Sequence, residues 1–341
     1  ENETHLALLE ASPDDRHLQH VYANSLVRMA RFVPNLERFD ESRELLEQAL
    51  ERLDALIESG PSNLDFFRDR GIVYASLGQM ERMQGQMEES ERLLRQSLED
   101  FSAVAVAGAS DSDDRFRESW VWHELAQCHR DQRRYDEAWD EHRQAMMIRE
   151  GLVEDAPGNA DYLSALGLSQ ASTGRLAQSI GREAESLELL TGALATSQAL
   201  VVAYPDVPLH LECVSGAASS LSTLLDGLGQ LEQSQHYSDI AFDAAGSLHA
   251  SHPETPAYSI CFGEAMLLRA RNLGTRGRWS EALARVEEAR KILDPLFAIR
   301  PWDSNCRFQI AAAKLQQAKA LFALGRDQEA LDLVAGFPPG P

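Results

Sequence analysis

The sequence repeats itself with a period of forty-eight residues, and this period decides what the chain can fold into. The segment GRWSEAL at 277–283 returns as GRDQEAL at 325–331. Stepping back from Gly277 by the period gives one column of turn residues: Gly229, Gly181, Arg133, Gly85 and Glu37. Prolines keep the same period, broken at Ala109, through Pro13, Pro61, Pro157, Pro205, Pro253 and Pro301. Two residue types in one register indicate a tandem array of structural repeats.

Small residues form four further columns around each turn. Five residues after the turn position lie Ser42, Ser90, Ala138, Ser186, Ser234, Ala282 and Ala330, and seven residues later Ala49, Ser97, Ala145, Ala193, Ala241 and Ala289. Before the turn run Ala30, Gly78, Ala126, Gly174, Ser222, Ala270 and Ala318, and also Ala23, Gly71, Ser119, Gly167, Ser215, Gly263 and Ala311. Seven residues are two helical turns, so these columns predict helix faces where neighbouring helices approach closely.

Each repeat predicts a helix A, a turn, a helix B and a stop at proline, which cannot continue a helix. No stretch shows the strict alternation of a β-strand. The predicted fold class is all-α, a right-handed α-solenoid of about seven antiparallel helix pairs in one continuous domain over 1–341. The A helices are expected near 15–34, 64–84, 115–132, 161–180, 209–228, 257–276 and 304–324. Pro295 should kink the sixth B helix.

The register also sets the predicted repeat boundaries. The repeats are 13–60, 61–108, 109–156, 157–204, 205–252, 253–300 and 301–341. Residues 1–12 align with the ends of other B helices, so we interpret them as the end of a preceding helix. We therefore expect the sequence to be a fragment whose upstream part holds at least one more helix, and GFPPGP at 336–341 to cut the last B helix short.

The spacing of small residues resembles the tetratricopeptide repeat. Ala270, Ala282 and Ala289 stand twelve and seven residues apart, with Gly277 and Trp279 between the first two. Phe39 and Tyr135 occupy the Trp279 column. The family's unit has about thirty-four residues, so both helices are longer here. Such long-helix variants look like the repeat regions attached to bacterial serine/threonine protein kinases. The resemblance covers nearly the whole chain, and it implies a fold rather than a ligand.

Composition excludes some classes of function. The formal net charge of −22 argues against a nucleic-acid partner, because phosphate binding needs a basic surface. No stretch approaches the roughly 18 apolar residues of a membrane span, so no membrane contact is expected and a cytoplasmic location is favoured. Four cysteines lack metal or redox spacing, and two histidine pairs lack further ligands, so neither a metal nor a cofactor is expected.

The resemblance implies that the A helices line a concave groove, where one column lacks acidic residues. It consists of Arg31, Gln79, Gln127, Arg175, Thr223, Arg271 and Lys319. Arg28, Arg82 and Arg130 lie three residues from members of that column, and Trp120 and His123 are candidates for an aromatic anchor. These residues predict a groove that binds an acidic or C-terminal carboxylate-bearing peptide. The alternative is that the arginines pair with acids on adjacent helices, such as Glu81 or Glu124.

Three classes of function remain. The first is a non-catalytic scaffold that holds a protein or peptide partner in the groove. The second is a regulatory or sensing region of a serine/threonine protein kinase, with the catalytic domain upstream, since neither an H-R-D loop nor a D-F-G motif is present. An enzyme in its own right comes third, because no acid/base pair is marked by its sequence context.

Overall fold

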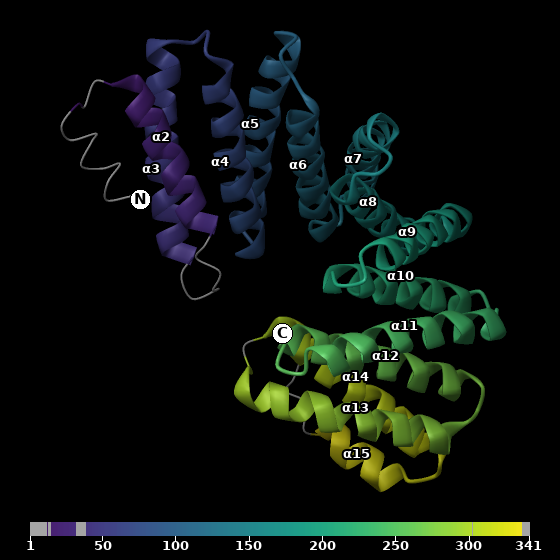
Figure 1. Ribbon diagram of the computed structural model, residues 1–341. Helices are drawn as coiled ribbons and strands as arrows, with labels where there is room; N and C mark the ends of the chain where they lie inside the picture. Colours follow the sequence, from purple (N-terminus) through teal and green to yellow (C-terminus); the bar gives the residue numbers. More distant parts are fainter. Residues whose placement is uncertain (1–11, 13–14, 32–38, 302, 336–341) are drawn as a thin grey trace. The chain divides into compact units, whose positions relative to one another are not determined.

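The computed structural model describes residues 12, 15–31, 39–301 and 303–335, and it contains fourteen helices. The A helices are α2 (Arg16–Arg31), α4 (Leu64–Met83), α6 (Ser112–Asp131), α8 (Ala160–Ser179), α10 (Pro208–Gly227), α12 (Pro256–Thr275) and α14 (Ser304–Ala323). The B helices are α3 (Phe39–Ser59), α5 (Met87–Val106), α7 (Tyr135–Asp155), α9 (Glu183–Ala203), α11 (Leu231–Ser251), α13 (Trp279–Ile299) and α15 (Asp327–Ala335). No strand occurs in these ranges, so the all-α prediction is confirmed (Figure 1).

The A helices begin and end within three residues of their expected bounds. The largest shift is at α6, which begins at Ser112 rather than near 115. Asp111 caps this helix: its side chain accepts a hydrogen bond from the Asp114 backbone, and the Asp114 side chain accepts one from the Asp111 backbone. This reciprocal capping box lets the helix begin earlier than the repeat register suggests. The expected end of the first A helix falls at 32–38, outside the described residues.

Each described A helix that precedes a column glycine ends in left-handed backbone. Gly85, Gly181, Gly229, Gly277 and Gly325 have φ values from 73° to 82°. In each case the next residue donates its backbone N–H to a carbonyl five residues earlier, as from Arg278 to Leu273. This bond satisfies the open carbonyls at the helix end and reverses the chain. Glycine suits the position because it lacks the Cβ that disfavours positive φ.

The third repeat has arginine at the turn position where other repeats have glycine, and it has alanine at its start where other repeats have proline. It nevertheless keeps the same turns. Arg133 has a φ of 62°, and Arg134 donates to the His129 carbonyl as the turn requires. Where Ala109 replaces the column proline, Gly108 takes a φ of 70° and the Ala109 N–H binds the Val104 carbonyl. Glycine at 108 therefore ends α5 in place of proline.

The four columns of small residues lie at helix contacts. In the B helices every described member of both columns is buried, including Ala49, Ala145 and Ala241, which are fully buried. Four serine members of these columns, Ser42, Ser97, Ser186 and Ser234, donate to carbonyls of the facing helix, as Ser42 does to Ala30 (3.1 Å). Short side chains bring the backbones close enough for such bonds. Ala311 at the end of its column is exposed.

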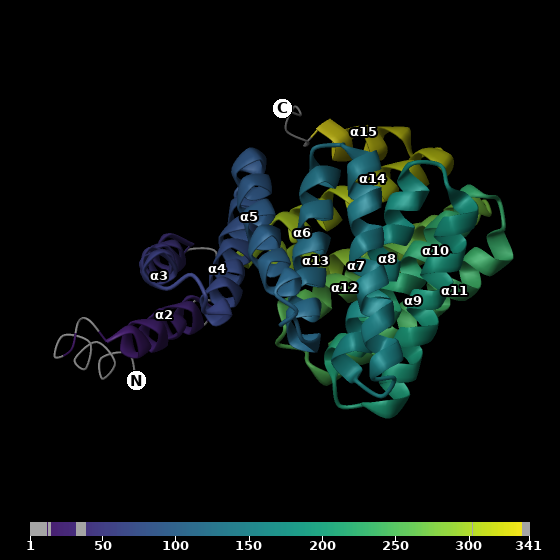
Figure 2. The ribbon, with the colours of Figure 1, turned by 90° about the horizontal axis from the view of Figure 1, so that it is seen from above.

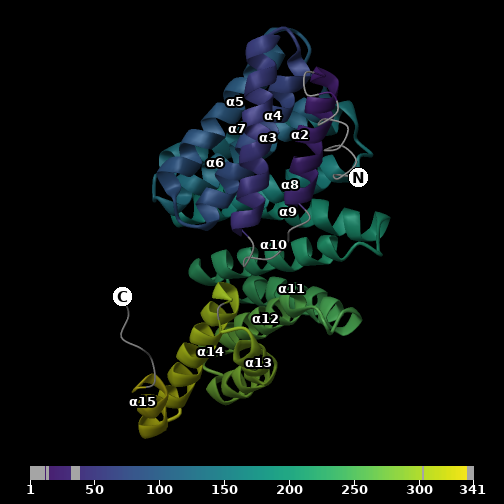
Figure 3. The same ribbon diagram turned by 90° about the vertical axis from the view of Figure 1, so that its left-hand side faces the viewer.

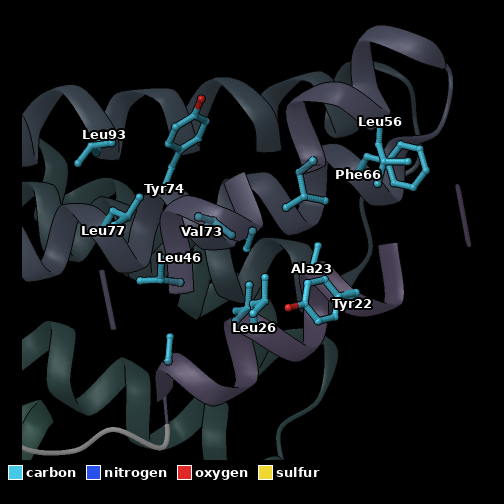
Figure 4. Packing of buried hydrophobic residues seen from close by; sticks show 14 of the residues in the cluster. Tyr22, Ala23, Leu26, Leu46, Leu56, Phe66, Val73, Tyr74, Leu77 and Leu93 are labelled. Atoms are coloured by element: carbon cyan, nitrogen blue, oxygen red, sulfur yellow. The ribbon is translucent and has the colours of Figure 1, made fainter. Parts of the chain in front are cut away.

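The chain divides into two compact units, residues 1–162 and 163–341. In unit 1 the helices α2 to α6 follow one another, and a core cluster fills the space between α2, α3, α4 and α5 with residues such as Leu26, Leu46 and Val73 (Figures 2 and 4). In unit 2 the helices α10 to α15 also follow one another, and α15 is the last of them (Figures 1 and 3). The expectation of one continuous solenoid stays a prediction.

Two features of the B helices complete the fold. α9 is long and apolar enough to cross a membrane by length and composition, with a mean hydropathy of 1.3, so the sequence expectation that no stretch approaches a span needs correction. Its Leu190, Ala193 and Leu194 are buried in a cluster shared with α10, and 33% of the apolar stretch of α9 is buried. α13 runs through Pro295 from Trp279 to Ile299, and the kink expected there stays a prediction.

Candidate functional site

The A helices line the candidate site because they pack on one another within each unit. α4 contacts both α2 and α6, and α12 contacts both α10 and α14. In unit 1, α3 and α5 each contact their own A helix and the A helix of the next repeat, and α11 and α13 do so in unit 2, whereas among the described residues no B helix packs on another B helix. The exposed side of the A layer is therefore a row of closely spaced parallel helices, where side chains from several repeats meet.

A hollow of about 340 Å³ opens on this layer in unit 1. Its apolar part comes from Ile72, Ala75, Phe101, Phe116, Trp120 and Val121, and its polar part from Ser76, Gln79, Asp113, Arg117 and Glu124. A neighbouring hollow of about 340 Å³ shares Ile72 and Arg117 with it and adds Val21, Asn24, Val27, Arg28 and Asp69. We call the two together the A-helix groove. It runs over α2, α4 and α6.

Aromatic rings form one wall of the A-helix groove. Phe116 and Trp120 meet edge to face with their ring centroids 6.2 Å apart. The guanidinium carbon of Arg149 lies 4.3 Å from the centroid of a Trp120 ring, in cation–π contact. Arg149 also donates to Ser119 Oγ at 3.0 Å and is fully buried, and this burial lowers its pKa to about 9. The buried Arg149 thus packs against the Trp120 ring and helps to fix its position.

The predicted basic side chains on α4 and α6 are engaged with acids. Arg82 forms ion pairs of 3.1 Å with both Glu124 and Asp131. Gln79 donates to Glu124 at 3.0 Å, and Arg130 pairs with Asp131 at 2.8 Å. At these residues the alternative from the sequence applies: the arginines pair with carboxylates of the same and the adjacent A helix, and Glu124 was one of the acids expected.

The other predicted residues of unit 1 differ in exposure. Arg28 is exposed on the A-helix groove and forms no ion pair with any described residue. Arg31 ends α2, and its side chain lies outside the described part of the structure. His123 and Gln127 are buried, 5% and 8% exposed, and their Nε2 atoms lie 3.3 Å apart. Burial makes them packing residues rather than members of the groove surface.

In unit 2 the predicted column splits in the same way. Arg175 is exposed on α8, and Lys319 is exposed on α14. Arg271 is half-buried; it donates to Thr223 Oγ1 at 2.7 Å and lies 3.8 Å from Asp226. Burial lowers the Arg271 pKa, and Asp226 acts in the opposite direction. Arg175 and Lys319 are therefore exposed to solvent, although Arg175 also donates to Ser172 Oγ at 3.2 Å. Arg271 is less exposed and forms its hydrogen bond to Thr223 inside the fold.

A buried ionisable cluster lies where α6 packs on α5 and α7. His129 is fully buried, with Nδ1 2.7 Å from Glu141 and Nε2 3.2 Å from Glu91. Burial lowers the His129 pKa, but the two carboxylates outweigh it and the pKa is raised overall. Burial raises the pKa of Glu91, yet hydrogen bonds from Arg134, Arg95 and His129 lower it to about 2. The cluster binds α6 to α5 and α7 by charge as well as by packing.

Sequence reasoning missed several groove residues, and the repeat register could have found one more. Phe116, Arg117 and Asp113 line the hollow, but nothing in their columns distinguishes them. Arg149 stands in a column whose other members, Leu53, Phe101, Ser197, Ala245 and Leu293, are uncharged and buried. An arginine at such a position is a recognisable departure, since a core arginine needs specific partners. Within the described residues no group of three or more His, Cys, Asp or Glu side chains is placed to hold a metal.

One segment of the chain matches a known protein family. Residues 73–104 match the family described as tetratricopeptide repeat. The match begins within α4, passes through the turn at Gly85 and ends near the end of α5. A search of curated proteins finds no match.

Three solved structures share the fold. Aspartyl phosphate phosphatase F from Bacillus subtilis matches with a TM-score of 0.60 at 14% identity, over 96% of this chain and 72% of its own. A signal transduction ATPase with a tetratricopeptide repeat sensor from Pyrococcus horikoshii gives 0.56 at 14% identity, over 98% of this chain and 43% of its own. The apo form of RapI matches with a TM-score of 0.56 at 10% identity, over 98% of this chain and 96% of its own.

Identities this low show similarity of fold alone, and the likeness to kinase-associated repeat regions stays a prediction. The helix pairs, the glycine turns and the family match at 73–104 agree with one another. The chain is an all-α protein built from tetratricopeptide-type repeats with a period of forty-eight residues.

Proposed function

We propose that this chain is a non-catalytic scaffold that binds a segment of a partner protein in the A-helix groove. The observation that carries the proposal is the hollow of about 340 Å³, walled by Phe116 and Trp120. A fixed aromatic wall beside an apolar floor suits an apolar side chain of a peptide, the kind of anchor that supplies most of the energy of such interfaces. Nro1, a nuclear import adaptor by its description, has a similar fold with a TM-score of 0.52 at 13% identity.

The charge around the hollow favours an acidic group next to that anchor. Asp69 is bound by His20 at 2.5 Å and by Asn24 at 2.9 Å, and Asp113 is paired with Arg117 at 2.7 Å. Arg28 is left to pair with a ligand, because a guanidinium group makes paired hydrogen bonds to a carboxylate. The acidic or C-terminal peptide expected from the sequence is therefore proposed on Arg28 in unit 1, and on Arg175 and Lys319 in unit 2.

The hollow is tested by filling it. Peptides selected from a display library on the native chain should lose about tenfold or more in affinity when Ser76→Phe blocks the hollow or Trp120→Ala removes its wall. Tyr135→Ala, at an exposed aromatic residue on a B helix of the same unit, is the matched control and should leave the affinity unchanged. Isothermal titration gives the affinities, and equal values for all four proteins would end the proposal.

The basic column is tested separately. The double variant Arg175→Glu, Lys319→Glu should weaken binding of acidic peptides, and the native affinity should fall as salt rises, since exposed charges are screened. Equal affinity for native and variant chains at low and high salt would remove these two side chains from recognition while leaving the hollow in place.

A regulatory or sensing region of a larger signalling protein, such as a serine/threonine kinase, is the second candidate. It is supported by the ATPase from Pyrococcus horikoshii, in which a tetratricopeptide repeat region is described as a sensor. The coding sequence upstream of residue 1 tests this directly. A kinase or ATPase domain in the same reading frame would support it, and a stop codon directly before the repeats would contradict it.

A further inference from the structure

The last A helix, α14, carries an exposed apolar stripe. Phe308, Leu315 and Phe322 stand seven residues apart, on one helix face, and their exposed fractions are 68%, 51% and 69%. Leu331 on α15 adds a fourth exposed apolar residue at 64%. We call these four residues the α14 stripe. Over fourteen residues the helical part is about 21 Å long, enough for several turns of a facing helix.

The equivalent positions one repeat earlier are buried. Ile260, Leu267 and Leu283 are exposed by only 3%, 2% and 6%, and they stand forty-eight residues before Phe308, Leu315 and Leu331. The residues that cover them are known: Ile260 and Leu267 share a core cluster with Cys306, Ile310 and Ala313 of α14, and Leu283 shares one with Ala318 and Leu321. The α14 stripe therefore continues a surface that in the preceding repeat is covered by an A helix.

Trp279 and α15 turn the C-terminal part of this surface into a hollow. Trp279, Lys319, Phe322 and Leu331, with three alanines, line a space of about 480 Å³. Its lining is almost wholly apolar apart from the ammonium group of Lys319. A facing helix would place a side chain there, as ridges of one helix enter grooves of another.

The charge of α14 selects among possible occupants. The helix carries Arg307, Lys314 and Lys319 and no acidic residue, in a chain with a net charge of −22. Arg307 and Lys319 are exposed and form no ion pair with any described residue. Two copies of this helix packed face to face would bring like charges together, which opposes self-association. Two of the three acids of the adjacent α15 are already engaged, Glu329 with Arg326 at 2.7 Å and Asp332 with Gln328 at 2.9 Å, and the third, Asp327, is exposed at the first turn of that helix.

We propose that the α14 stripe binds an amphipathic α-helix of a partner protein whose apolar face is flanked by acidic residues. The partner helix covers the stripe as α14 covers Ile260 and Leu267 in the preceding repeat. Its apolar side chains cover Phe308, Leu315 and Phe322, and its carboxylates pair with Arg307 and Lys319. This surface is distinct from the A-helix groove, which lies in unit 1. It shares Lys319 with the basic column proposed above, and the variants at Phe308 and Leu315 distinguish the two sites.

The test uses the full chain and two synthetic helical peptides of about 20 residues. Both carry leucine at every third or fourth position; one is flanked by glutamate and the other by lysine. We expect fluorescence anisotropy to show binding of the glutamate peptide and about tenfold or more weaker binding of the lysine peptide. Phe308→Ser with Leu315→Ser should reduce affinity for the glutamate peptide about tenfold or more. Val202→Ser, at another residue of unit 2 that is 84% exposed, should not.

Three outcomes would overturn the proposal. The first is equal binding of the two peptides, which would exclude charge selection. The second is binding that survives the double substitution, which would place the site elsewhere. The third is a chain that sediments as a dimer and becomes a monomer in the double variant, which would make a second copy the occupant. Because the substituted residues are exposed, the variants should keep the native circular dichroism melt, and binding loss without a change in melting is the supporting result.

Discussion

Arg133 holds left-handed backbone, with a φ of 62°, at a turn position that is glycine in five other repeats. The Cβ of an L-residue costs about 1–2 kcal/mol in this conformation. Arg133 is exposed and forms no ion pair with any described residue, so no ion pair within the described part of the chain offsets the strain. The turn forms because its backbone hydrogen bonds and the packing of the two helices outweigh that cost.

Arg133→Gly should therefore stabilise the protein by up to about 1 kcal/mol, since glycine removes the strain but gives the unfolded chain more freedom. The midpoint of urea denaturation should rise. The matched control is Gly181→Ala, which introduces the Cβ at the equivalent turn and should lower the midpoint by a similar amount. A fall in the midpoint for Arg133→Gly would mean that the arginine side chain stabilises the turn.

His129 provides a prediction on pH. Its pKa is raised in the folded protein, so the proton is bound more tightly there than in the unfolded chain, where the ordinary value is about 6.5. The stabilisation is complete below that value and is lost as pH rises through the higher, folded-state pKa. We expect His129→Gln to cost on the order of 3 kcal/mol at about pH 6 and progressively less at higher pH. Urea denaturation across pH checks this; a pH-independent difference would show that His129 does not titrate.

At the scale of elements, the small columns set how closely A and B helices approach. Ala282 is 3% exposed, and its column contains only serine and alanine. At Gly263 an added Cβ would lie 2.7 Å from a Leu293 side-chain atom, so the neighbouring column has no spare room either. Interiors packed at this density resist added volume.

Ala282→Leu should overpack this contact and destabilise the protein by about 1–3 kcal/mol. Ala284→Leu, two residues along the same helix at an exposed position, is the matched control and should change stability by less than about 0.5 kcal/mol. Thermal melts followed by circular dichroism give the comparison. Equal melting of the two variants would show that the column is not a tight interface.

At the scale of the whole molecule, the dominant property is the net charge of −22. Ion pairs recur throughout unit 1, including Arg70 with Asp100 at 2.7 Å and Arg68 with Asp114 at 2.8 Å. In these pairs the carboxylates are largely buried, whereas most of the remaining acids are exposed on the B helices. The excess of exposed acids repels itself and destabilises the compact state.

Moderate salt should therefore stabilise the protein. Raising NaCl from about 20 mM to about 200 mM shortens the screening length to less than about 10 Å, which weakens repulsion between separated surface acids more than it weakens the buried pairs. The urea midpoint should rise, while a neutral osmolyte at matched osmolality controls for general solution effects. A falling midpoint would show that exposed ion pairs contribute more than the repulsion does.

The repeat register alone determined which segments are helical and where they turn. The column glycines end A helices, the small columns are buried, and seven helix pairs follow, because these features depend on spacings of less than one repeat. The register also marks Gly108, which ends α5 where the column proline is missing, and Arg149, which is the one charged residue in a buried column.

Only the tertiary structure decided which side chains of the A helices are exposed. His123 and Gln127 share the helix face of the A-helix groove by spacing, yet they are buried, and Arg82 is engaged by acids at positions 124 and 131. The pairings of Arg82 cross from one repeat to the next, and exposure depends on the size of neighbours forty-eight residues away. A period in the sequence determines where helices form, because their hydrogen bonds are local. It cannot determine which side chains are exposed, since exposure depends on the particular side chains that meet across repeats.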